Sequence, residues 1–566
     1  FFRIELKGSV ASDAAITREW DDVDAALRRA EAHFPQGVIK PELNRKAMDQ
    51  EAIIIAITGS ESARHRAMVD LEKEVYKLRD VAAVTNIGDP GRQVTVALRR
   101  ERLAASGLNA AQVLGQIQLA NQRLGGGSLD EKGQKINLKP VNGLDSVAEL
   151  KSLYLAVPRG GSIPLAQIAN VSEAPVTPVT EEMRWQGQPA SGLGVVPRAD
   201  IDLVKFGRAM STTVIAFAQK NAGDAKIEII NSQPDFVSAR LRELAISLVE
   251  SMLILGAMMV LTMGTRVGLL VAVMLPVISL IALALNTIAG GVLHQISIAA
   301  VVMSLGMLID NVIVVTESVQ EQIDRGISAK EAASHTVSQF SVPLLSSTLT
   351  TIASFLPMLL AKGTTAEFTF AIPAIAITTL SVSWVAAVFL TPALAAWGLK
   401  PGGVREWKFL PSLSNWVAET ALRKTRRLWL GIAGLLVVAT LSAITIGQKF
   451  FPSADRDQLV VEILYPEGVA FSKTRAAVTE LEARLSADDK VLAHAAFVGR
   501  STPRFYYNLN QSPNAPHLAQ VLVMTKGVKY HKQLMRTISA LVLPDNPRII
   551  VRSLEQGPPV PAPVEI

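Results

Sequence analysis

Long apolar blocks fill the middle of the chain, and mixed polar sequence lies on either side of them. Residues 1–240 and 448–566 carry charges throughout, whereas the stretch between them has long segments almost without charge. A helix needs about 20 mostly apolar residues to cross the hydrocarbon core of a bilayer. Six segments are long enough, and the sequence predicts a membrane span in each: 246–263, 267–289, 296–316, 341–361, 368–397 and 428–447.

Lys and Arg are unevenly distributed among the connections between these spans. Ten of them follow the first, third and fifth spans, whereas Lys362 is the one basic residue after the second and fourth. The positive-inside rule therefore places the first group in the cytoplasm. Because six crossings return the chain to its starting side, we expect a multi-pass inner-membrane protein with both polar portions in the periplasm. Segment 402–420 fits an amphipathic helix on the inner surface and a basic linker equally well.

Strand and helix patterns recur in the two polar portions. Residues 51–60 form a β-branched run, the next segment to residue 79 has helical spacing, and 84–88 is a second short run, which predicts a β-α-β unit. Similar signals return at 190–196, 203–220, 226–230, 458–465 and 472–485. We therefore expect two small α+β modules before the spans and one after them. A loop-rich, hairpin-like insertion is marked by residues 125–127 and 158–164.

Composition narrows the chemistry. Hydrophobic residues make up 49% of the chain and charged residues 19%, which favours a membrane protein. The absence of cysteine excludes a disulfide framework, thiol catalysis and a thiolate metal site. The net charge of +6 is explained by basic residues beside the spans, so no nucleic-acid partner is expected. No GxxxxGK[ST] motif occurs, which argues against ATP as the energy source. The first residues, FFRIELKG, resemble the start of an excised piece.

The third predicted span contains a carboxylate where none is expected. In the segment SLGMLIDNVIVVTES, Asp310 and Asn311 lie near the middle of the membrane. A carboxylate at this depth costs about 2.5–3.5 kcal/mol on insertion scales, so it indicates a functional site. Asp310 is predicted to take up and release a proton; the alternative is an ion-pair partner. The six predicted spans contain no Lys or Arg, so any basic partner comes from outside this chain.

Other polar residues of the spans allow two interpretations each. Glu250 in the first span either joins the polar region around Asp310 or is solvated at the outer interface. Glu317 fits an interfacial charge better than a proton relay. The hydroxyl residues either line a water path or bond their own helix backbone; they are the cluster 346–351 with Thr378, Thr379, Ser381 and Ser383.

Three segments carry a family resemblance: LGMLIDNVIVVTESVQEQIDRG, SVPLLSSTLTTIASFLPMLL and VAAVFLTPALAAWGLKP. They resemble the fourth to sixth spans of resistance-nodulation-division (RND) efflux transporters, in the hydrophobe and amphiphile branch of AcrB-like permeases. FFPSADRDQLVVEILYPEG and EQGPPVPAPVEI resemble the second periplasmic half of that family. The resemblance implies an incomplete RND fold with these parts: periplasmic porter subdomains at 1–90 and 179–240, a docking insertion at 91–178, a transmembrane domain at 241–447, and a second-half porter subdomain at 448–566.

The resemblance also implies residue roles. Asp310 matches the first carboxylate of the family's Asp-Asp or Asp-Asn pair, and Asn311 takes the second position. Glu250 and Glu317 match acidic family positions. The family's partner Lys belongs to a later span that this chain lacks.

Substrate residues follow from the resemblance less directly. Ala52 and Ile87 occupy two positions where AcrB-type pockets have aromatic residues. Phe497, Arg504, Phe505 and Tyr506, followed by Tyr507, form an aromatic and basic cluster that either faces the substrate or, by strand alternation, lies half in a core.

The sequence therefore predicts a secondary active transporter rather than an enzyme. Protonation of Asp310 would drive antiport of hydrophobic or amphiphilic compounds across the Gram-negative envelope, with the proton gradient in place of a cofactor and no metal. The resemblance implies a homotrimer in membrane lipid, working with a periplasmic adaptor and an outer-membrane channel as a tripartite pump.

Three alternatives compete with this interpretation. An RND relative that exports lipid or another non-drug substrate shares the fold. An intramembrane aspartyl protease needs two facing carboxylates, and here only Glu250 is available to Asp310. A metal exporter is disfavoured because neither polar portion has an evident Met cluster.

Overall fold

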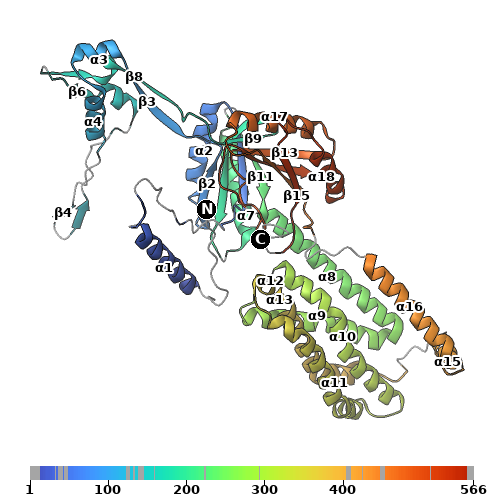
Figure 1. Ribbon diagram of the computed structural model, residues 1–566. Helices are drawn as coiled ribbons and strands as arrows, with labels where there is room; N and C mark the ends of the chain where they lie inside the picture. Colours follow the sequence, from blue (N-terminus) through green and yellow to red (C-terminus); the bar gives the residue numbers. More distant parts are fainter. Residues whose placement is uncertain are drawn as a thin grey trace.

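The computed structural model describes residues 13–31, 33–35, 43, 49–122, 128–131, 134–137, 144, 146–158, 160–199, 201–221, 225–291, 294–402, 409–423, 425–445, 453–509 and 511–557. The glycine run 125–127 and the whole PPVPAPVEI segment, 558–566, lie outside this description. A helical bundle lies on one side of a large sheet, and a slender arm extends from the sheet's far side (Figure 1).

Five helices are long and apolar enough to cross a membrane, and they correspond to the first five predicted spans. They are α8 (Gln233–Met263), α9 (Thr265–Ile288), α10 (Gln295–Asp324), α11 (Ala329–Leu359) and a composite helix, Thr365–Gly398. Several begin earlier or end later than predicted, because polar turns continue the helix beyond its apolar part. Hydropathy marks only the apolar part.

The composite helix changes its winding near its centre. It comprises α12 (Thr364–Thr369), α13 (Ala371–Val385), the π-helical turn η1 (Ala386–Leu390) and α14 (Thr391–Gly398). In the π turn the N–H of Thr391 bonds the carbonyl of Ala386, five residues back. Pro392 follows directly and has no N–H to donate, so the regular α-helical ladder is already interrupted here. The wider turn therefore lies where the backbone hydrogen bonding is weakest.

The prediction of six spans is not confirmed. In the described part of the chain, α16 (Thr425–Thr445) contains an apolar stretch, Leu428–Ile444, that is shorter than the five spanning helices. At 1.5 Å per residue this stretch is about 25 Å long, short of the roughly 30 Å hydrocarbon core. Segment 402–420 is largely helical, as α15 (Phe409–Arg423), and residues 403–408 lie outside the description.

Two β-α-β segments before the bundle interlock into one unit rather than two. Helix α2 (Glu61–Val75) joins β1 (Ile53–Gly59) to β2 (Val81–Ile87), and α7 (Leu203–Lys220) joins β10 (Gln188–Pro197) to β11 (Ala225–Ser232). The strand order is β11-β1-β10-β2. Strand β10 therefore lies between β1 and β2, and β1 lies between β10 and β11. The expectation of two separate modules was wrong, because it used local patterns alone.

The second unit, after the bundle, repeats this topology and confirms the predicted α+β module. Its elements are β12 (Gln458–Leu464), α17 (Phe471–Ala487), β13 (Val491–Val498), β14 (Leu518–Thr525), α18 (His531–Ser539) and β15 (Arg548–Ser553). The strand order is β13-β14-β12-β15, and all neighbours are antiparallel. The two units are thus split β-α-β folds of the ferredoxin-like kind.

A four-residue strand joins the two units into one nine-stranded sheet. Strand β9 (Glu182–Trp185) pairs with β10 of the first unit and with β13 of the second. We call β9, with these two neighbours, the seam. The four helices cover one face, where Ile55 packs under α2 and α7 and Val461 under α17 and α18. The opposite face has its own apolar cluster, which continues across the seam.

The arm leaves the first unit as a ribbon of β3 (Arg92–Leu98) and β8 (Ala169–Pro175) (Figure 1). Its tip packs on a separate apolar cluster that includes Leu155, Leu165 and Ile168. The remaining elements of the arm are α3 (Arg100–Ser106), α4 (Ala110–Ala120), β4 (Ser128–Glu131), β5 (Gln134–Asn137), α5 (Val147–Ser152), β6 (Tyr154–Ala156), β7 (Ser162–Pro164) and α6 (Leu165–Ile168). Helix α1 (Asp13–Glu31) precedes the sheet.

Candidate functional site

Asn311 connects three helices inside the bundle. Its side chain is buried, and Nδ2 donates to Thr348 Oγ1 of α11 at 3.2 Å and to Ser383 Oγ of α13 at 3.4 Å. The hydroxyl of Ser383 in turn donates to the carbonyl oxygen of Leu308 at 2.6 Å. Buried polar groups are stabilising only when they are hydrogen-bonded. Asn311 therefore fixes the position of α10 against α11 and α13.

The hydroxyls predicted to line a water path or to bond their own helix fall into two groups. Thr348 and Ser383 meet Asn311, whereas Thr350, Thr351, Thr378, Thr379 and Ser381 donate to carbonyl oxygens of their own helices. Such bonds satisfy a hydroxyl locally and need no water.

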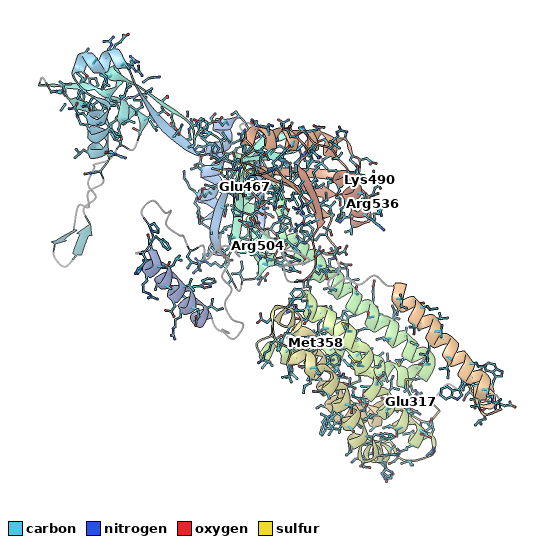
Figure 2. All side chains as sticks on the ribbon, in the orientation of Figure 1. Glu317, Met358, Glu467, Lys490, Arg504 and Arg536 are labelled. Carbon is cyan, nitrogen blue, oxygen red and sulfur yellow. The ribbon has the colours of Figure 1, made fainter. Side chains whose placement is uncertain are left out.

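Asp310 lies on a different face of α10 from this network. Successive helical residues are about 100° apart, so Asn311 points inward while Asp310 is exposed. Glu317 follows two turns later on the same exposed face, and Figure 2 shows it at the edge of the bundle. We call this face the α10 stripe: Met303, Gly306, Asp310, Val314, Glu317 and Glu321. In the described chain, neither Asp310 nor Glu317 has a hydrogen bond or ion pair.

Glu250 is exposed on α8. The described residues offer it no hydrogen bond or ion pair, so the structure does not bring it into contact with Asp310. Two facing carboxylates, which aspartyl proteolysis requires, are thus not assembled in this part of the chain. Nor does the described chain contain a group of three His, Asp or Glu residues able to hold a metal ion.

The six predicted substrate residues gather on the helix-free face of the sheet. Ile87, Phe497, Phe505 and Tyr506 belong to one cluster, together with Met183 and Trp185 of β9. The N–H of Glu51 donates to the carbonyl of Arg504 at 2.9 Å, which brings Ala52 to the same place. We call this group the aromatic cluster.

All six of these residues are buried, and the exposed fraction of Ile87, Phe497 and Phe505 is 0%. Strand alternation therefore does not place only half of this group in a core: Phe497 on the strand and Phe505 and Tyr506 in the following loop are all buried. A ligand that contacts these side chains must therefore open the cluster. An open groove of about 500 Å³ lies elsewhere, between α11 and α14, and none of the predicted site residues lines it.

Two residues that the sequence did not single out adjoin the aromatic cluster. Burial raises the pKa of the Glu51 carboxyl, and its Oε2 has no hydrogen-bond partner. The guanidinium of Arg456 lies 4.2 Å from the ring centroid of Phe236 and 4.7 Å from that of Tyr506. Burial lowers the pKa of Arg456 to about 10, so it stays cationic at neutral pH.

An aromatic contact continues from this cluster to the bundle. The rings of Tyr507 and Phe368 stack with their centroids 6.0 Å apart, and Phe368 belongs to α12. Phe236 lies in the first turns of α8. Figure 2 places Arg504 where the sheet approaches the bundle. The loop after β13 thus contacts the bundle helices directly.

Comparison with known proteins identifies related sequences. The model of the AcrB/AcrD/AcrF family matches residues 9–540. "Multidrug resistance protein MdtC" of Pantoea ananatis is 25% identical over 499 residues, which cover 84% of this chain and 48% of that protein. The protein of the same name from Escherichia coli strain SE11 is 22% identical over 533 residues, covering 90% of this chain and 52% of the relative. The chain spans about half the length of these curated relatives.

Proposed function

This chain belongs to the AcrB/AcrD/AcrF family of RND permeases, and on that premise we propose that it forms part of a proton-driven exporter of hydrophobic or amphiphilic compounds. The observation that carries the proposal is the position of Asp310. It lies midway along a spanning helix, on a face that the described chain leaves uncovered. A carboxylate there is costly unless it is protonated or paired, and alternation between these two states is what proton coupling requires.

The hydrogen bonds of Asn311 offer a way to transmit a change in the protonation of Asp310 to the neighbouring helices. The Asn311 amide ties α10 to α11 and α13 at all pH values, because an amide does not titrate in this range. A displacement of α10 on protonation of Asp310 would therefore carry α11 and α13 with it. In this proposal Asp310 is the proton carrier, Asn311 is a fixed link, and Glu250 and Glu317 are secondary.

The basic partner of Asp310 would come from the part of its relatives' length that this chain does not cover. The α10 stripe is available for that contact, and the chain covers about half of its relatives. We further propose the assembly that the family implies: a sixth span at 428–447, a periplasmic sheet and arm, a homotrimer in the inner membrane, and an adaptor and outer-membrane channel as partners.

We propose that substrate reaches the aromatic cluster. The contacts of Tyr507 with Phe368, and of Arg456 with Phe236 and Tyr506, give the loop after β13 a physical connection to the bundle. Movement of α8 or α12 would pull on this loop and open the cluster that is closed here. The two curated relatives are named multidrug resistance proteins, which favours drugs over lipids as the substrate class.

The test is dye accumulation in an efflux-deficient Gram-negative strain that carries the full-length protein, its adaptor and its channel. We expect Asp310→Asn to abolish efflux at unchanged membrane expression. Glu321→Gln is the matched control, since it neutralises another exposed carboxylate of the same stripe that has no role in the proposal, and it should retain export. Equal export by the wild type and Asp310→Asn would exclude Asp310 as the proton carrier.

A further inference from the structure

A second group of titratable residues lies on the helix-covered side of the seam. Arg184 of β9, Glu482 of α17 and His494 of β13 are 8%, 2% and 2% exposed. They come from positions up to 310 residues apart in the chain and meet where the two units join. Buried ionisable groups are rare unless they are paired or functional, so this cluster needs a physical explanation.

Arg184 connects the cluster across the seam. Its Nε donates to Glu482 Oε2 at 2.6 Å, one terminal nitrogen donates to Glu182 Oε1 at 3.0 Å, and the other donates to the Gly187 carbonyl at 2.6 Å. Glu182 is held in turn by Arg475, at 2.8 Å. All the hydrogen-bonding nitrogens of Arg184 thus point to acceptors of both units.

Two polar atoms of this cluster have no hydrogen-bond partner among the described residues. Glu482 Oε1 and His494 Nε2 are both buried, neither has a hydrogen-bond partner, and they face each other at 3.8 Å. Two unpartnered polar atoms at this distance are costly in a dry interior. At 3.8 Å the two atoms are too far apart for a hydrogen bond, and neither has another partner among the described residues.

We propose that Glu482 and His494 form a proton-binding site outside the membrane bundle, and that its occupancy sets how firmly the two units are joined at the seam. This site is separate from Asp310 and does not depend on the proposed transport cycle. It would make the sheet responsive to the pH of its own compartment.

The charges around His494 determine the direction of the response. The charged groups next to it are Glu482 of α17 and Arg184 of β9, whereas Glu182 and Arg475 pair with each other farther along the seam. On β14 the residue opposite His494 is Val523, which carries no charge. Burial, and next the charge of Arg184, lower the pKa of His494, so the imidazole is neutral at pH 7. A proton on it would place a second positive charge beside Arg184.

Proton linkage gives the direction in which pH changes the closure of the seam. When the seam is closed, His494 binds a proton less readily than in an open, solvated seam, where its pKa is about 6.5. Closure is therefore favoured above that value and becomes less favourable as the pH falls below it. Glu482 acts in the opposite direction, since burial raises its pKa while Arg184 limits the rise. Because the hydrogen bond and charge of Arg184 hold that rise back, we expect His494 to determine the response between pH 6.5 and 5.5.

Hydrogen exchange measured by mass spectrometry tests this on the full-length protein in lipid nanodiscs. Exchange of peptides covering 182–187 and 491–498 would be followed between pH 8 and pH 5.5, after correction for the intrinsic rate. We expect protection of these peptides to fall by about threefold or more in the wild type as the pH passes below 6.5. His494→Gln should show no such fall.

His531→Gln is the matched control. His531 is also a buried histidine of the second unit, but its Nε2 lies 3.0 Å from Thr525 Oγ1 and away from the seam. This variant should keep the pH response of the seam peptides. A response that persists in His494→Gln, or that is absent from the wild type, would overturn the proposal.

A second measurement needs no substitution and so does not depend on the folding of a variant. Exchange at the imidazole C2 position of the wild type reports the pKa of each histidine. For His494 we expect a value below 6.5. A value at or above 6.5 would contradict the proposed coupling between the proton and closure of the seam.

Discussion

The helical bundle and the sheet differ in how their charged side chains are paired. At the seam, the charge of Arg184 is matched within the chain by Glu482 and Glu182. On the α10 stripe, Asp310 and Glu317 have no partner among the described residues. A charge is far more costly in hydrocarbon than in a sheet bordered by water. The region where a partner matters most is therefore the one in which the described residues supply none, and the chain spans about half the length of its curated relatives.

The largest expected effect concerns the unpartnered carboxylate. Asp310→Asn should reduce efflux in the complete protein to the level of a strain without the pump, because an amide cannot take up and release a proton. Asp310→Glu keeps the titratable group and should retain part of the activity. Dye accumulation at matched expression measures both. If Asp310→Glu were as inactive as Asp310→Asn, side-chain shape rather than protonation would be decisive.

The next largest effect is expected when one partner of the Arg184–Glu482 pair at the seam is removed. Glu482→Leu leaves Arg184 with a buried, partly unmatched charge, which should lower the free energy of unfolding of the sheet by about 3–5 kcal/mol. Arg184→Met should do the same to Glu482. The double variant replaces the pair by apolar groups and should recover much of the loss. Denaturant unfolding of the full-length protein checks this; additive losses in the double variant would show that the pair is not one interacting unit.

A smaller effect is expected for the polar link inside the bundle. Asn311→Ala leaves the Thr348 hydroxyl without its amide donor and removes a connection between α10 and α11. We expect a loss of about 1–2 kcal/mol, because other hydrogen bonds remain available to the hydroxyls. Thermal unfolding in detergent measures it. Thr350→Ala is the control, since that hydroxyl bonds only its own helix, to Ser346.

The smallest effect is expected at the contact between the sheet and the bundle. Arg456→Lys keeps the positive charge but loses the flat guanidinium that lies against Phe236 and Tyr506. We expect a loss of stability of about 0.5–1 kcal/mol. The same variant should weaken transport more than this small loss explains, if the loop after β13 is connected to the bundle as proposed. Transport that is unchanged in Arg456→Lys would argue against that connection.

The features that could be predicted from the sequence are those with a local cause. Six apolar segments were predicted to span a membrane, and five of them are helices of spanning length among the described residues. Asp310 was identifiable because a charge in such a segment is an exception. The strand and helix patterns identified the strands and helices of the first unit, but only β12 and α17 of the second, since alternation and helical spacing depend on neighbouring residues alone.

The features that were missed depend on distant partners. The interlocking of β1 with β10 joins residues about 140 positions apart, which no local pattern encodes. Glu482 resembles an ordinary surface acid of a helix until Arg184, 298 residues away, is placed against it. One signal was present: Glu482 follows Val478 by four residues and precedes Leu485 by three, so it lies on the apolar stripe of α17.

The π turn at Ala386–Leu390 has a consequence for how this gene can vary. A π turn holds one residue more than an α-helical turn, so loss of one codon there would leave an ordinary helix with its flanking faces nearly in phase. The same loss in α10 would rotate every later side chain by about 100° and separate Asn311 from Thr348 and Ser383. In a scan of single-codon deletions, we expect survivors within 386–390 and none within the central turns of α10.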